Sequence, residues 1–176
     1  MPVESECMVQ LKYFGDDRDY FKYDSITLLL KAGLFRHYAF VPMLTEHRVD
    51  GEGQKRPKPQ PGRSEALLSF IRACPENDMN QWREWLSPYV DDYSTLEPVD
   101  STWFRAESRG EYWEQARALI GRESTLVFID PDTGLQTGTP GYRRKAGPEK
   151  YLLNEELAGI YGAMAPRSAV MIYQHL

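Results

Sequence analysis

One short segment limits the fold of this 176-residue chain more than any other. Residues 126–129 are four consecutive apolar residues with β-branched and aromatic members, which is typical of a strand buried on both faces. The run leads directly into the acidic turn Asp130-Pro131-Asp132. A buried carboxylate without a partner is costly, so acids at the end of a buried strand indicate a binding or reacting site.

Helical and strand-like segments alternate along the rest of the chain. The pattern predicts a helix over residues 20–32, with Asp17 or Asp19 as its N-cap and Gly33 as its stop. A strand over 38–44 should end near Val41, because Pro42 has no N–H to donate. Further helices are expected over 65–73, 80–89, 112–120 and 151–164, and further strands over 101–104 and 169–173. This alternation predicts an α/β, three-layer, Rossmann-like domain with a mainly parallel sheet.

Two polar segments without apolar periodicity interrupt a chain that otherwise reads as a single domain over 1–176. We expect loops near 45–63 and 136–149, and the first is long enough to be a functional lid or a mobile excursion. Cys7 and Cys74 are too few for a disulfide framework or a cysteine metal cluster. The acidic start is not a secretory signal, and no apolar run reaches the ~20 residues that span a bilayer. We therefore expect a cytoplasmic protein without a membrane partner; the oligomeric state stays open.

The acids of the turn are the first candidate site. Asp130 and Asp132 could be catalytic groups, metal ligands or hydrogen-bond acceptors for a base or ribose, or they could simply cap local amides in a turn. The sequence Tyr173-Gln174-His175 ends the next strand. A right-handed crossover would bring these two strand ends together, so His175 could join the acids as a base or metal ligand. The alternative for His175 is an ordinary terminal histidine.

Charged residues in two other segments are further candidates. Residues 12–24 carry three acids within four positions, and carboxylates suit hard cations, so Asp17 could complete a metal shell. Lys12 and Lys22 alternate with aromatic residues there and could bind nucleic acid. Acids that favour a helix N-terminus explain the same pattern equally well. The basic cluster Arg143, Arg144 and Lys145 could meet a phosphate backbone or be a solvated loop, in a chain whose net charge is −5.

The segment Val127-Phe-Ile-Asp-Pro-Asp-Thr-Gly resembles a motif of class I S-adenosylmethionine-dependent methyltransferases, in which Asp-Pro-Pro-Tyr or a related tetrapeptide follows the fourth strand. Asp130 and Pro131 match that motif, whereas Asp132 and Thr133 depart from it. The order of elements is most similar to the three-Cys-motif partner proteins, a methyltransferase-like bacterial family. The segments Lys-Tyr-Phe-Gly-Asp, Asp-Pro-Asp-x-Gly-Leu and Tyr-Gln-His are also similar to an uncharacterised bacterial family.

This resemblance implies a methyltransferase-type fold and a nucleic-acid-modifying enzyme in which Asp130 contacts the target base or its amine. S-adenosylmethionine would be the cofactor. The family carries a glycine-rich turn after its first strand, but this chain has Met43-Leu44-Thr45-Glu46-His47 there, so the cofactor would need an unusual loop. The fingerprint Gly-x-Gly-x-x-Gly is also absent, which disfavours a nicotinamide enzyme.

Two other functions remain open from the sequence. In a divalent-metal hydrolase such as a nuclease, Asp130, Asp132 and His175, with Asp17, would hold Mg²⁺ or Mn²⁺, and a metal-activated water would attack a phosphodiester. In a non-enzymatic module with a degenerate cofactor loop, residues 12–22 or 143–145 would bind a protein or a nucleic acid.

Overall fold

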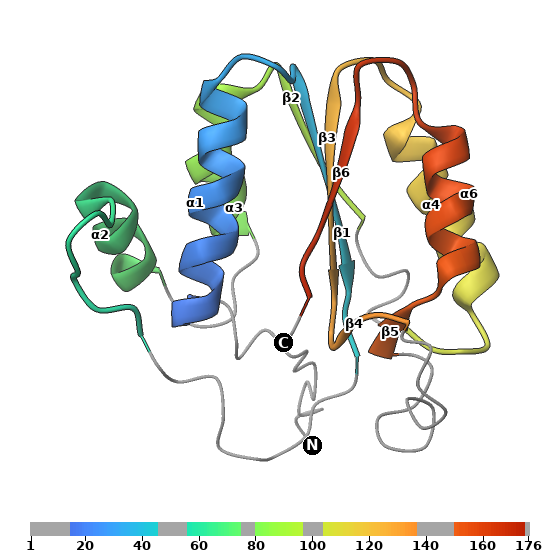
Figure 1. Ribbon diagram of the computed structural model, residues 1–176, viewed down its shortest axis with the longest axis horizontal. Coiled ribbons are helices and arrows are strands. Elements are labelled where there is room, and N and C mark those ends of the chain that lie inside the picture. The colour runs from blue at the N-terminus through green and yellow to red at the C-terminus, as the bar shows by residue number, and fades with distance from the viewer. Residues whose placement is uncertain (1–14, 46–55, 75–79, 97–103, 137–149, 175–176) are drawn as a thin grey trace, which may run out of the picture.

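A computed structural model describes residues 15–45, 56–74, 80–96, 104–136 and 150–174. Its centre is a parallel four-stranded sheet in the order β2-β1-β3-β6. The strands are β1 (His37–Met43), β2 (Asp92–Thr95), β3 (Thr125–Pro131) and β6 (Ala169–Ile172). On one face lie α1 (Asp17–Lys31), α2 (Glu65–Ala73) and α3 (Asn80–Leu86), and on the other α4 (Arg109–Ile120) and α6 (Asn154–Ala163) (Figure 1). The predicted α/β fold with a mainly parallel sheet is confirmed.

The ends of α1 follow from its flanking residues. The N-cap is Asp16, not Asp17 or Asp19 as predicted, because Asp16 has extended backbone and its Oδ1 accepts from the N–H groups of Arg18 and Asp19. At the other end Gly33 adopts a φ of +69°, the left-handed conformation that stops a helix, as the sequence indicates. Ser64 caps α2, accepting from the N–H of Leu67.

Strand β1 continues through Pro42 to Met43, past the predicted end near Val41. The Phe40 carbonyl points toward β2, where it accepts from the N–H of Leu96. Backbone groups of alternate residues in a strand point to the same side, so the backbone nitrogen of Pro42 also faces β2. The pairing of β1 with β2 ends at Phe40, so the missing N–H of Pro42 removes no bond between these strands. The pairing of β1 with β3 continues on the other side, where Pro42 lies opposite Asp130.

Two other elements differ from the sequence prediction. Strand β2 contains one apolar residue, Tyr93, in the sequence Asp-Tyr-Ser-Thr, so no apolar pattern reveals it. Residues 151–152 form the short strand β5 (Tyr151–Leu152), which pairs with β4 (Gly134–Leu135), and α6 begins only at Asn154. A short 3-10 helix, Ser87–Tyr89, closes the predicted helix 80–89. Within the described ranges, no helix combines the length and apolarity that a bilayer span requires.

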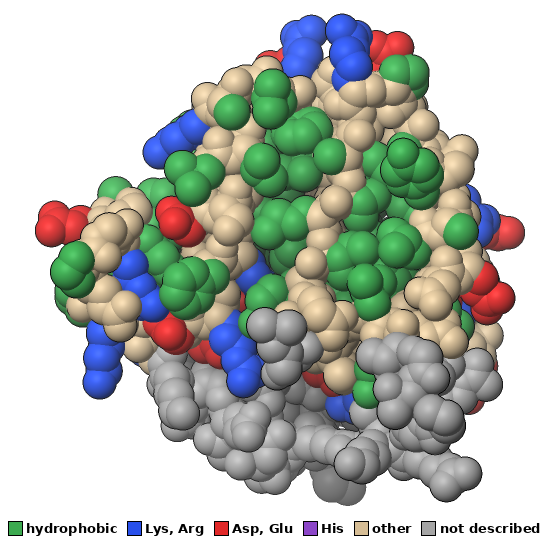
Figure 2. Space-filling view, viewed as in Figure 1, with side chains coloured by type: hydrophobic (Ala, Val, Ile, Leu, Met, Phe, Trp, Pro, Cys, Tyr) green, Lys and Arg blue, Asp and Glu red, His purple; other side chains and the backbone are tan. Residues whose placement is uncertain are grey.

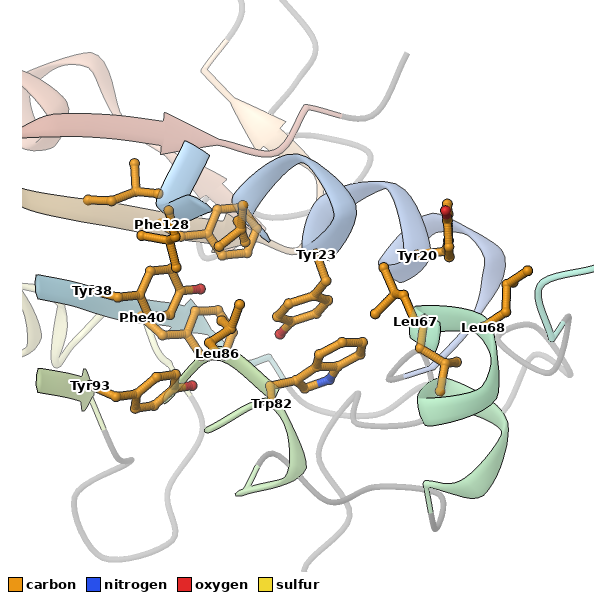
Figure 3. Close-up of a cluster of buried hydrophobic side chains, with 14 residues drawn as sticks. Tyr20, Tyr23, Tyr38, Phe40, Leu67, Leu68, Trp82, Leu86, Tyr93 and Phe128 are labelled. Carbon is orange, nitrogen blue, oxygen red and sulfur yellow. The ribbon is translucent and has the colours of Figure 1, made fainter. Parts of the chain in front are cut away.

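Apolar side chains pack on both faces of the sheet. The central strands β1 and β3 therefore lie between two apolar clusters. On the α1 face the rings of Tyr23 and Trp82 stack with an interplanar angle of 2°, and Phe40 stacks on Phe128 (Figure 3). On the opposite face a second cluster of α4 and α6 side chains covers the same two strands. Strands buried on both faces hold their carboxyl ends in fixed positions, which matters for the site there.

Candidate functional site

The acidic turn lies where the strand connections diverge. After β1 the chain runs to α2, on the α1 face of the sheet, whereas after β3 it runs to α6 on the opposite face (Figure 1). Neighbouring parallel strands whose connections leave in opposite directions form a topological switch point, and α/β sheets bind ligands at the carboxyl ends of such strands. Asp130 is paired with Pro42 at this end of β1 and β3.

Three charged side chains meet at this point of the sheet. Lys22 of α1 donates a hydrogen bond from Nζ to Asp130 Oδ2 across 2.7 Å, and the same Nζ lies 3.1 Å from Asp19 Oδ1. Lys22 and Asp19 are buried, and Asp130 is partly exposed. Tyr173, which follows β6, covers the ammonium, with its ring centre 4.4 Å from Nζ. We call Asp19, Lys22 and Asp130 the charged triad.

Burial and charge act in opposite directions on the triad. Burial raises the pKa of Asp19 to about 6, even though the nearby Lys22 ammonium lowers it, and the charges of Asp130 and Asp16 raise it further. Burial by itself lowers the pKa of Lys22, but the carboxylates of Asp130 and Asp19 more than offset this, so the pKa of Lys22 is raised. The triad thus combines a permanent cation with one acid that titrates just below neutral pH.

The turn before α1 sets the position of Asp19. The N–H of Gly15 donates to Asp19 Oδ2 across 2.8 Å. Gly15 has a φ of +84°, a conformation that residues with a Cβ rarely adopt, so this turn favours glycine. Asp19 therefore accepts a backbone hydrogen bond at the start of the helix and also forms an ion pair with Lys22.

Asp132, the second acid of the turn, has a different partner. It forms an ion pair with Lys150, which precedes β5. The same turn is held by a hydrogen bond from the N–H of Thr133 to the Lys150 carbonyl, and by one from the N–H of Leu135 to Gln174 Oε1 across 2.6 Å. The predicted approach of the β3 and β6 ends is confirmed for Tyr173 and Gln174. The two acids themselves are bound by lysines from separate parts of the chain.

The other predicted site residues lie apart from the triad or outside the described residues. Asp17 pairs with Arg63 at 2.6 Å, and Lys22 is buried rather than displayed to solvent. The candidates that lie outside the described residues are Lys12, Arg143, Arg144, Lys145 and His175. In the described parts of the chain, no group of three or more His, Cys, Asp or Glu side chains is arranged to hold a metal ion. The predicted metal and nucleic-acid roles of these residues stay predictions.

Two features of the site were missed in the sequence. Asp19 and Lys22 are three residues apart on a helix, a spacing that places both on one face, but only the fold shows that Asp130 completes the triad. Thr45, two residues beyond the end of β1, has a buried hydroxyl to which no described residue bonds.

Comparisons of this chain with protein-family models, with curated proteins and with solved structures found no match. The resemblance to the methyltransferases therefore depends on the residues and motifs that carry it, and it remains a prediction.

Proposed function

We propose that this chain is a nucleic-acid-modifying enzyme of the methyltransferase type, whose reacting centre lies at the carboxyl edge of the sheet beside Asp130. The observation that carries this proposal is the 2.7 Å hydrogen bond from Lys22 to Asp130 Oδ2 at the switch point. This bond holds one oxygen of the carboxylate in place. No described residue donates a hydrogen bond to the second oxygen, Oδ1, which can therefore accept one from the amine of a target base.

The end of β1 offers a partner for the cofactor. The buried Thr45 hydroxyl lies where the family has its glycine-rich turn, and it has the chemistry to bond one polar group of S-adenosylmethionine. The cofactor supplies an electrophilic methyl group, while Asp130 orients the amine and Lys22 keeps Asp130 in place.

The alternative of a divalent-metal hydrolase has less support from the geometry. Asp130 and Asp132 are each engaged by a lysine ammonium, and these lysines come from different segments. A cation that used both carboxylates would have to displace two ion pairs and draw the two acids toward each other. The lysine partners suit an acid that accepts a hydrogen bond better than an acid that binds a metal.

Calorimetric titration with S-adenosylmethionine and S-adenosylhomocysteine, followed by assays of methyl transfer to DNA and RNA, tests the proposal. Wild type is expected to bind both ligands. Asp130→Asn should keep this binding but lose transfer by about 10²-fold or more, the loss that a misplaced reacting group typically causes. Asp91→Asn is the matched control, because Asp91 forms an exposed ion pair with Arg36 at the other edge of the sheet. Absence of heat at millimolar ligand, or full transfer activity in Asp130→Asn, would overturn the proposal.

A further inference from the structure

We propose that a basic strip beside the triad binds the backbone of single-stranded nucleic acid while the exposed ring of Phe21 stacks on one of its bases. The strip consists of Arg18, Arg56, Lys58, Arg63 and Arg72. The inference rests on the proposed function for the reaction that follows, but the binding itself can be measured without it.

The loop that carries most of the strip is held in a defined position. Residues 56–63 have the sequence Arg-Pro-Lys-Pro-Gln-Pro-Gly-Arg, which contains three cations and no acid. Arg56 Nη1 donates to the Gly15 carbonyl across 3.3 Å, and Arg72 Nη2 donates to the Pro57 carbonyl across 3.3 Å. These two bonds tie the loop to the start of α1 and to the end of α2. The cations therefore lie beside each other in the folded protein.

Among the described residues of this surface, exposed cations exceed exposed acids, although the whole chain is acidic. Asp17 lies within the strip, but its carboxylate is paired with Arg63 at 2.6 Å. Glu65, at the start of α2, is the exposed acid next to the loop. The described cations of the strip that are exposed are Arg18, Lys58 and Arg72. In Figure 2, Lys and Arg side chains lie around the lower ends of α1 and α2, with some Asp and Glu side chains between them. Such a cluster attracts phosphates even on a protein with net negative charge.

An exposed aromatic ring adds a second kind of contact. Phe21 is 54% exposed, so its ring is accessible to a ligand. The Arg63 guanidinium lies 4.9 Å from the Phe21 ring centre and 4.8 Å from that of Tyr20, which fixes the ring beside the strip. Aromatic rings next to cations stack on unpaired bases without regard to sequence. Bases in a duplex are stacked on each other, so this surface suits a single strand.

The strip is continuous with the proposed reacting centre. Phe21 and Lys22 are neighbours on α1, and Lys22 bonds Asp130. Hydrogen bonds also lead from Arg56 to Gly15 and from Gly15 to Asp19 of the triad. The surface that would hold a strand and the lysine that bonds Asp130 therefore lie at the same end of α1.

Fluorescence anisotropy with labelled single-stranded DNA and RNA, with a duplex for comparison, tests the inference over a range of salt concentrations. Phe21→Ala should weaken single-strand binding by about 5- to 150-fold, the range for loss of one stacked base. Lys58→Glu should weaken it and reduce the salt slope by about one unit or more, because a phosphate contact is lost. Lys31→Glu makes the same charge change in the last turn of α1 and should leave binding unchanged.

Each other outcome is decisive. Unchanged affinity in both Phe21→Ala and Lys58→Glu, with circular dichroism showing intact folding, overturns the inference. Equal losses of affinity in Lys58→Glu and Lys31→Glu would show that the nucleic acid is attracted to the charge of the whole protein, and would overturn the inference. Tighter binding of the duplex than of the single strand would also overturn it. Single-strand binding by the strip without S-adenosylmethionine binding would support the strip and reject the proposed enzyme.

Discussion

The 2.7 Å hydrogen bond from Lys22 to Asp130 ties the first helix to a central strand of the sheet. The lysine side chain is 9% exposed and the aspartate side chain 18%, so water screens this pair little. Ion pairs of this kind are weak evidence for stability as a whole, because burial of both charges costs about as much as their attraction returns. Removal of one partner alone is different, since it leaves a buried charge unpaired.

Lys22→Met should therefore destabilise the fold by about 3–5 kcal/mol, because two carboxylates lose their cation. Urea unfolding followed by circular dichroism measures the change. Arg36→Met is the matched control: Arg36 and Asp91 are 73% and 55% exposed, and loss of such a pair costs about 0–1 kcal/mol. Equal effects of the two substitutions would show that the triad is not a buried charge network.

The pH dependence of Asp19 gives a second prediction. Burial raises the pKa of Asp19 to about 6 in the folded protein, above its value of about 4 in an unfolded chain. The folded state therefore holds the proton more tightly, and the stability from Asp19 falls as pH rises from about 4 to about 6. Above about pH 6 the contribution of Asp19 to the free energy of unfolding is lost.

Asp19→Asn removes this titration, so the stability of wild type relative to the variant should fall by roughly 3 kcal/mol between about pH 4 and about pH 7. Urea unfolding of both proteins at the two pH values gives the difference directly. Asp24→Asn, on the partly exposed side of the same helix, serves as the reference substitution. A constant difference between wild type and Asp19→Asn across this range would contradict the assignment.

Gly134→Ala should cost about 1–3 kcal/mol. Gly134 has a φ of +133°, which residues with a Cβ adopt only under strain, and a Cβ would also collide with the Gln174 side chain. Thermal and urea unfolding measure the loss. In Gly162→Ala nothing lies near the new methyl group, and alanine favours helix, so a gain of up to about 1 kcal/mol is expected. Addition of Gln174→Ala should restore little, because the backbone strain remains.

Ser64→Ala should destabilise α2 by about 1 kcal/mol, because Ser64 Oγ accepts from the N–H of Leu67 at the helix start. Ser69→Ala, an exposed position inside the same helix, should be neutral or slightly stabilising. Hydrogen exchange at the Leu67 amide reports the lost bond separately from global stability. Unchanged exchange at this amide in Ser64→Ala would contradict the cap.

The parts of the fold that the sequence predicts well depend on local patterns. The apolar run 126–129, the cap at Ser64 and the stop at Gly33 each carry their own signal, and each is present in the structure. Strand β2 carries no such signal, because it is held by pairing with β1 rather than by apolar alternation. The triad was hidden for a related reason: residues 22 and 130 become neighbours only through the order of the sheet, which no local pattern encodes.

The pairing of β1 with β3 also determines when the centre of the sheet can form during synthesis. Residues 37–43 pair with residues 125–131, so the two strands at the centre of the sheet are separated by more than eighty residues of chain. During synthesis, β1 cannot pair with β3 until β3 has left the ribosome. Before that point, the side chains of Phe40 and Val41 are not covered by the completed sheet. Non-local parallel pairing is slow to form and leaves apolar strands open to aggregation. A growing chain of this protein is thus expected to need chaperone protection until residue 131 has emerged.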